Sequence, residues 1–117
     1  MALSNAGKNA LLNGLAGAAS HVSLHTANPS TNGVNEVSGG SYTRETLPWA
    51  SASGGSLTTN ANVVFDVPAG TTISHIGYWS AATSGTFYGG VELDQSQTFA
   101  TAGTYTIAAG NISETIS

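Results

Sequence analysis

The stretch Ile73-Ser74-His75-Ile76-Gly77-Tyr78-Trp79 is the densest hydrophobic run of this chain. Isoleucine, tyrosine and tryptophan are enriched in β-strands, and turn residues stand on both sides of the run, at Pro68-Ala69-Gly70 and at Ser84-Gly85. We therefore expect a central β-strand over residues 73–80. A glycine inside a strand is typical of a close approach by another segment, and we expect such an approach at Gly77.

The residues on both sides of this run alternate between apolar and polar, as half-buried strands do. Before it, Val63, Phe65 and Val67 would face one side of a strand. After it, a return strand is expected over residues 86–93, and its Gly89-Gly90 pair predicts a β-bulge.

Further strands are expected over residues 21–26, 42–49, 103–108 and 111–116. About seven short strands, with turn signals every eight to twelve residues or so, are typical of an antiparallel β-sandwich or a jelly-roll-like barrel. We therefore predict a mainly β chain with a single domain over residues 1–117, in which residues 21–117 form the β module. A chain of this length has room for one core.

The N-terminal segment, residues 1–17, is interpreted as a short α-helix that begins at the N-cap Ser4 and ends at Gly14 and Gly17. An isolated helix of this length is marginal in water, so it must pack on its own domain, which we favour, or on a neighbouring subunit. The apolar flank of this helix is formed by Leu3, Ala10, Leu11, Leu12 and Leu15. Its three later leucines, Leu11, Leu12 and Leu15, are candidate assembly contacts.

The chain is poor in charge. Of its 117 residues two are basic and six are acidic, for a formal net charge of -4, whereas thirty are serine or threonine. Nucleic-acid binding needs clustered lysine and arginine, so we expect no nucleic-acid partner. Acid–base catalysis and metal binding need ionisable groups that converge, so we expect no enzyme, no cofactor and no metal. The chain has no cysteine, and its N-terminal stretch is too polar and too short for a signal peptide or a membrane span.

The three histidines are the remaining candidates for chemistry. His21 and His25 lie four residues apart, which on a strand separates them by about 13 Å, too far for one metal ion. His75 lies within the hydrophobic run and is interpreted as a core or sheet histidine. A hydrolase is the weakest alternative, because it would need a serine or a carboxylate close to His75.

Four segments carry a resemblance to a known family. They are residues 23–29 (SLHTANP), 35–44 (NEVSGGSYTR), 65–72 (FDVPAGTT) and 75–81 (HIGYWSA). Together they resemble small virion proteins of tailed bacteriophages, of the kind described as tail-fibre-like or minor structural proteins, and the likeness spans nearly the whole chain.

The resemblance implies a non-enzymatic structural component of the virion, made in the host bacterial cytoplasm and assembled on the head or the tail. Such an accessory protein would decorate the head or join the tail, would contact the major capsid or tail protein, and would form a homo-oligomer. Arg44, the only arginine, lies in a resembling segment. We expect it to pair with Glu36 or Glu45 or to contact a neighbouring subunit.

The alternative function is a tail-fibre module that binds host surface glycans. The aromatic side chains either fill the core or form a sugar-stacking surface, with Tyr78 and Tyr88 as the candidate exposed pair. Glu92 and Asp94 lie two residues apart on an expected strand, so they would share a face and add sugar contacts or half of a cation site. A solvated strand edge is the simpler explanation for these two carboxylates. Exposed aromatics would favour glycan binding, and buried aromatics would favour a scaffold.

Overall fold

A computed structural model describes residues 2–116 of the chain. One helix and eight strands are described within these residues. In chain order they are α1 (Asn5–Ala18), β1 (His21–His25), β2 (Glu45–Thr46), β3 (Ser56–Thr58), β4 (Val63–Val67), β5 (Thr71–Trp79), β6 (Phe87–Phe99), β7 (Gly103–Ile107) and β8 (Ser113–Thr115).

Strand β5 lies inside the main sheet, as the hydrophobic run predicted. This sheet has the strand order β2-β1-β5-β6, and each neighbouring pair is antiparallel. Leu24 of β1 and Val91 of β6 lie opposite Ile76 of β5, one on each side. Because cross-strand partners point to the same face, these three side chains form one apolar row.

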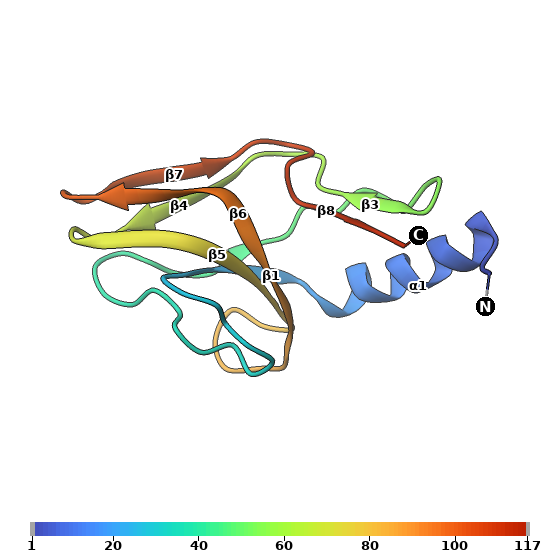
Figure 1. Ribbon diagram of the computed structural model, residues 1–117, viewed down its shortest axis with the longest axis horizontal. Coiled ribbons are helices and arrows are strands. Elements are labelled where there is room, and N and C mark those ends of the chain that lie inside the picture. The colour runs from blue at the N-terminus through green and yellow to red at the C-terminus, as the bar shows by residue number, and fades with distance from the viewer. Residues whose placement is uncertain (1, 117) are drawn as a thin grey trace.

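A second layer closes the core. Strands β4 and β7 form an antiparallel pair, and β3 and β8 form another. Figure 1 shows the β4–β7 pair running alongside β5 and β6. Both layers contribute to the core: Phe65 of β4 is fully buried, and so are Leu24 of β1 and Ile73 of β5. The predicted fold class is therefore confirmed: a mainly β, antiparallel, sandwich-like arrangement with one N-terminal helix.

Strand β6 is longer than predicted, since it has 13 residues and ends at Phe99. Its second half is polar and lacks the apolar alternation that marks a strand, but it pairs with the start of β5, where Ile73 lies opposite Gln97. The strand predicted over residues 42–49 is reduced to β2. Pro48 has no backbone N–H to donate to a neighbouring strand. The side chains of Tyr42 and Arg44, just before β2, make the loop contacts described below.

The close approach predicted at Gly77 is confirmed. A Cβ atom at this position would lie 2.7 Å from His25 Nε2 and 2.8 Å from both Ser23 Oγ and Phe87 Cε1. Only a residue without a side chain fits between these groups.

Helix α1 begins as predicted, because Ser4 Oγ accepts a hydrogen bond from the Gly7 backbone N–H at 3.1 Å. The helix does not end at Gly14 and Gly17, however, and continues to Ala18. Glycine disfavours a helix by only about 1 kcal/mol, which is too little to stop it. The helix ends where the chain enters the sheet, since the Ser20 N–H already donates to the Trp79 carbonyl at 3.0 Å.

Helix α1 projects from the β layers beside β3 and β8 (Figure 1), and the molecule measures 47 × 25 × 21 Å. One side of the helix docks on its own domain, as expected. Asn9 Oδ1 and Asn13 Oδ1 accept hydrogen bonds from the backbone N–H groups of Gly55 and Ala52, each at 2.9 Å, and Leu12 is buried. Within residues 2–116, no helix is long and apolar enough to cross a membrane.

Candidate functional site

Arg44 is held entirely within the chain. Its Nε and Nη2 donate to the two carboxylate oxygens of Glu36 at 3.0 and 2.9 Å, so the predicted pairing with Glu36 or Glu45 falls on Glu36. Its Nη1 donates to the carbonyls of Ala81 and Ser84 at 3.0 and 2.8 Å. The guanidinium carbon lies 3.7 Å from the centroid of the Trp79 ring. These contacts fix the loop between β5 and β6 and leave little of Arg44 for a neighbouring subunit.

Tyr42 extends the same network inward. Its hydroxyl donates to Glu36 at 2.9 Å and accepts from the Leu24 backbone N–H at 3.0 Å. Burial raises the pKa of Tyr42 far above its usual value, so its hydroxyl stays protonated and keeps donating. The arrangement is a structural brace between the 36–44 segment and β1.

Ser23 and His25 form a second buried polar cluster under the loop that follows β1. The His25 Nδ1–H donates to the Val34 carbonyl at 2.8 Å, which leaves Nε2 to accept from Ser23 Oγ at 2.6 Å. Ser23 Oγ also accepts from Trp79 Nε1 at 2.8 Å. The pair has the contacts of a nucleophile and a base, but both residues are fully buried. Their hydrogen bonds hold β1 against the loop that covers it.

The other two histidines, His21 and His75, each lie beside the serine that precedes them in the chain. His21 Nδ1 lies 2.8 Å from Ser20 Oγ, and His75 Nδ1 lies 2.7 Å from Ser74 Oγ. Glu92 is the cross-strand partner of His75, so the serine and the carboxylate that a hydrolase would need do lie near this histidine. Ser74 and His75 are chain neighbours, and neither lines the groove described below. No group of three metal-ligating side chains gathers within residues 2–116.

Of the four candidate glycan contacts, Tyr78 is excluded from the surface. It is only 4% exposed, its hydroxyl donates to Glu114 at 2.7 Å, and its ring packs edge-on against Trp49. The expected exposed pair of Tyr78 and Tyr88 is therefore wrong. Residue 78 shares a face with Ile76, and that face is the core. Tyr88 is 45% exposed. It has no partner on β5, because a β-bulge lies at this residue, one position before the Gly89-Gly90 pair at which the bulge was predicted.

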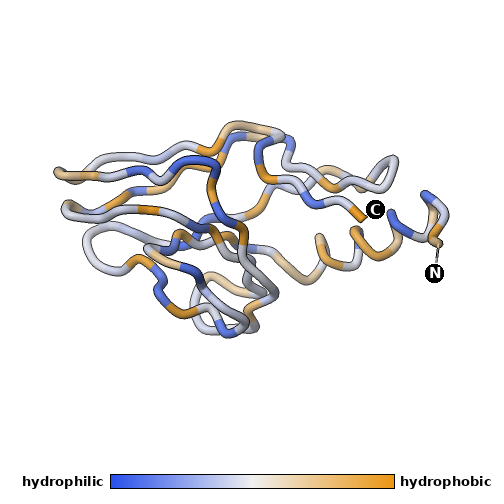
Figure 2. The backbone as a smooth tube through the Cα atoms, viewed as in Figure 1, coloured by the Kyte–Doolittle hydropathy of each residue, from blue (hydrophilic) through white to orange (hydrophobic). Residues whose placement is uncertain are grey.

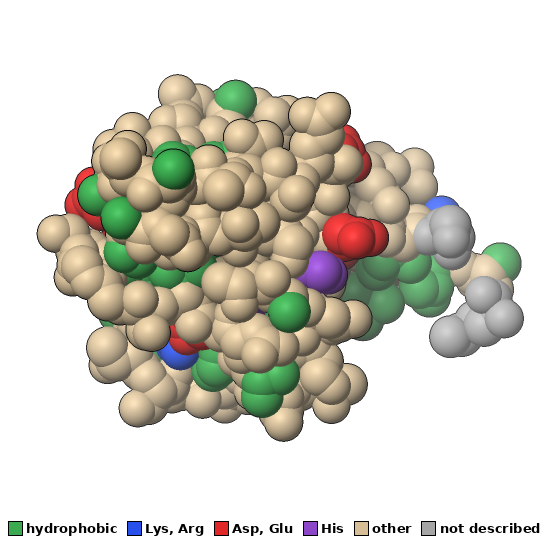
Figure 3. Space-filling model, turned by 60° about the vertical axis from the view of Figure 1, so that its left-hand side comes forward, with side chains coloured by type: hydrophobic (Ala, Val, Ile, Leu, Met, Phe, Trp, Pro, Cys, Tyr) green, Lys and Arg blue, Asp and Glu red, His purple; other side chains and the backbone are tan. Residues whose placement is uncertain are grey.

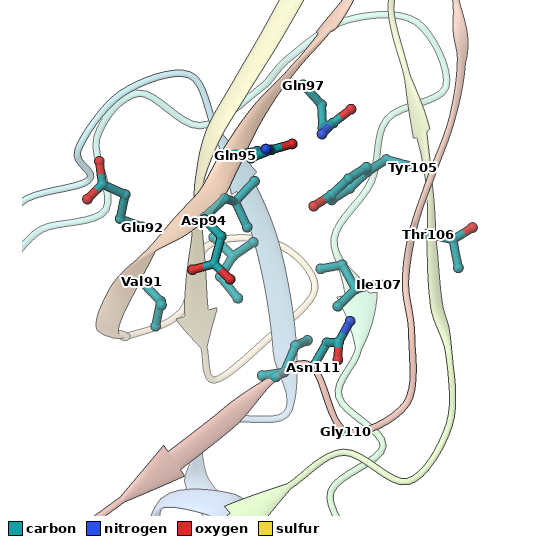
Figure 4. A pocket seen from close by; sticks show the side chains of 13 residues that line it. Val91, Glu92, Asp94, Gln95, Gln97, Tyr105, Thr106, Ile107, Gly110 and Asn111 are labelled. Atoms are coloured by element: carbon teal, nitrogen blue, oxygen red, sulfur yellow. The ribbon is translucent and has the colours of Figure 1, made fainter.

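A groove opens between β6 and β7, with a volume of about 660 Å³ (Figure 4). Its floor is formed by the buried isoleucines Ile76, Ile107 and Ile112. Around them stand Val91, Glu92, Leu93, Asp94, Gln95, Gln97, Tyr105, Thr106, Gly110 and Asn111. The groove thus includes the two predicted carboxylates, although Figure 4 shows Glu92 pointing away from the other side chains.

Sequence reasoning missed the amide and aromatic residues of this groove. Gln95 and Gln97 are the only glutamines of the chain, and both line it. Tyr105 is partly buried, which raises the pKa of its phenol, and its ring is held edge-on by Phe99 at a centroid distance of 6.5 Å. The available signal was the polar run over residues 94–98 inside an otherwise alternating β pattern.

The projecting side of α1 is the other feature of the surface. Leu11 is 58% exposed, more than any other large hydrophobic residue described. Figure 2 shows hydrophobic residues along this helix, and Figure 3 shows them gathered at the projecting end while charged side chains are few and scattered. Leu12 is buried, and the partly buried Leu15 packs against the protein's own core.

A charge-poor β-sandwich, braced by buried polar clusters and carrying a projecting helix, has the features of a structural module. The particular family follows from the sequence: residues 2–115 match the family model described as Podophage GP4 fiber I protein gp80. The chain therefore belongs to this family and is a phage tail-fibre-type virion protein. No curated protein matches the chain.

Proposed function

We propose that this protein is a non-enzymatic subunit of a phage tail fibre and that copies of it associate through the outer side of α1. The carrying observation is the apolar outer side of this helix, where Leu11 is 58% exposed. A surface helix normally turns its apolar stripe inward and its polar residues to solvent. Here Leu12 is buried on the docked side, where Asn9 and Asn13 also accept hydrogen bonds from the domain. The side that faces outward is nevertheless formed by apolar or small residues.

The outer side of α1 is formed by Ala6, Ala10, Leu11, Gly14 and Gly17, all of them exposed. Glycine and alanine let a second backbone approach closely, and Leu11 supplies an apolar side chain to bury. The helix contains three glycines and three asparagines, so its intrinsic helix propensity is low. Burying the outer side would stabilise it.

A second copy of the chain is the partner that this surface fits. The helix carries one charged residue, Lys8, and its side chain lies near Gly55 on the docked side. Two outer sides can therefore meet without like-charge repulsion. Of the candidate assembly contacts, only Leu11 supports this proposal. The side chains of Leu12, Leu15 and Arg44 make their contacts within the subunit.

The family description, a fibre protein, supports a place on the tail rather than on the head. The partners would then be other tail proteins. Head decoration, the second location that the sequence left open, would instead require binding to the major capsid protein.

The test is the mass of the purified chain in solution, by light scattering across a concentration series. We expect a defined oligomer that Leu11→Glu converts to a folded monomer. Val64→Glu is the matched control, because Val64 is also an exposed hydrophobic residue, at 48%, but lies on β4, and it should leave the oligomer intact. A wild-type monomer at every concentration, or equal effects of the two variants, would refute assembly through α1.

A second candidate function, recognition of a host glycan, is favoured by the groove between β6 and β7. Tyr88, Glu92 and Asp94 remain its candidate contacts from the sequence, but only the two carboxylates line the groove.

A further inference from the structure

We infer that the groove between β6 and β7 binds a neutral saccharide, through Gln95, Gln97, Asn111 and Asp94 around the ring of Tyr105. This inference deepens the glycan-binding candidate above. It does not depend on assembly through α1.

The groove is built by an irregularity of β6. Ile73 of β5 lies opposite Gln97, whereas His75 lies opposite Glu92. Between these two pairs β5 supplies one residue and β6 supplies four, so β6 carries three extra residues there. A bulge of this kind re-aims side chains and is typical of the surroundings of binding sites. Figure 4 shows the amides of Gln95 and Gln97 directed toward Tyr105 across the groove.

The polar side chains of the groove are unused by the fold. Elsewhere in the chain, five asparagines use their side-chain amides to hydrogen-bond to the backbone: Asn9, Asn13, Asn28, Asn35 and Asn62. Within residues 2–116, no such hydrogen bond is made by the side chains of Asp94, Gln95, Gln97, Tyr105 and Asn111. Donors and acceptors are thus presented together over an apolar floor, which is the general composition of small-ligand sites.

The chemistry of these groups matches a sugar. An amide offers two donors and an acceptor, and a carboxylate offers acceptors only, so together they can pair with hydroxyl groups, which both donate and accept. The Tyr105 ring, held by Phe99, offers a fixed apolar surface for the C–H face of a sugar ring. The groove volume of about 660 Å³ falls within the usual range for ligand sites.

Charge disfavours an acidic saccharide as the ligand. Two carboxylates and no lysine or arginine line the groove, and both basic residues of the chain are elsewhere, Lys8 on α1 and Arg44 on Glu36. A sugar that carries carboxylate or phosphate would therefore meet repulsion without compensation.

The same features disfavour a β-strand as the occupant. Bulges and charged side chains are the means by which strand edges avoid pairing with other chains. A second copy of β6, paired antiparallel about Leu93, would place Glu92 opposite Asp94 of its partner. Like charges directly opposite each other destabilise a strand pair.

The experiment is a titration of the isotopically labelled full chain, observed by the backbone and side-chain amide signals in NMR. The probes are maltotriose, mannotriose and chitotriose as neutral saccharides, and trigalacturonate as the acidic one. We expect at least one neutral probe to give saturable shifts at the side-chain amides of Gln95 and Gln97 and along residues 103–112. The acidic probe should leave these signals in place.

Variants assign the effect to the groove. Gln95→Ala and Gln97→Ala should each weaken binding by roughly tenfold, equivalent to about 1.4 kcal/mol. Ser96→Ala lies in the same bulge but outside the groove lining, and Tyr88→Ala removes the exposed tyrosine; both should bind as the wild type does. Absence of shifts with all three neutral probes, shifts centred on Tyr88, or equal binding of trigalacturonate would overturn the inference. Each of these outcomes is independent of the mass measurement that tests assembly.

Discussion

At the scale of single residues, Arg44 is the charged side chain whose loss we expect to cost most stability. Arg44→Ala removes both guanidinium contacts to Glu36, which keeps only the Tyr42 hydroxyl as a side-chain donor, and it leaves two loop carbonyls without theirs. Because Glu36 is 22% exposed, we expect a loss of about 2 to 3 kcal/mol in unfolding free energy, somewhat less than for a fully buried pair. Denaturant unfolding measures it.

The matched controls use the other basic residue and a conservative change. Lys8→Ala should alter stability by no more than about 0.5 kcal/mol. Arg44→Lys should recover only part of the loss, because an ammonium group cannot bridge both carboxylate oxygens as the planar guanidinium does. Full recovery by lysine would show that charge alone, and not the fork geometry, holds the loop.

His25 makes stability depend on pH. Burial lowers its pKa below the ordinary 6.5, with smaller opposing effects from Val34 and Glu36. The unfolded chain therefore takes up a proton at a higher pH than the folded one. The contribution of neutral His25 to the unfolding free energy is therefore fully present above about pH 6.5. It is lost progressively as the pH falls from there toward the lowered pKa of the folded state.

The measurement is the urea midpoint between pH 7.5 and pH 5, together with an NMR titration of His25. We expect the midpoint to fall below about pH 6.5 and the imidazole of His25 to stay neutral where the unfolded chain is already protonated. A constant midpoint, or one that rises on acidification, would contradict this assignment.

At the scale of elements, the two kinds of glycine in this chain predict opposite outcomes. Gly77→Ala forces a methyl group against His25 and Ser23 in β1 and Phe87 in β6, so we expect overpacking to destabilise the sheet by about 1 to 3 kcal/mol. Thermal unfolding of the variant measures the loss. Retention of full stability would mean that β1 and β6 can move apart at this point.

Gly14→Ala is the contrasting change within α1. A Cβ at Gly14 meets nothing within 4 Å, and alanine favours a helix over glycine by about 1 kcal/mol. We expect the monomer, at low concentration, to unfold at a higher temperature than the wild type. A decrease would indicate that the backbone at Gly14 is already in contact with another chain.

At the scale of the whole molecule, the sequence predicted what depends on local periodicity. The central strand, the Ser4 cap and the close approach at Gly77 follow from patterns within a few residues. The groove does not, because it arises from the register between β5 and β6 and from the position of β7, which pairs with β4 instead of β6. Tyr78 was misplaced although its two-residue spacing from Ile76 indicated the buried face.

The separation of α1 from the groove leads to a prediction about the whole subunit. The outer side of the helix and the lining of the groove share no residue, and the helix lies at the projecting end of the molecule. Leu11→Glu should therefore abolish self-association and leave saccharide binding unchanged. Gln95→Ala should weaken saccharide binding and leave self-association unchanged. Light scattering and NMR titration on the same two samples measure both properties. If Leu11→Glu also weakened binding, neighbouring subunits would have to complete the groove, and the site would belong to the assembled fibre rather than to one chain.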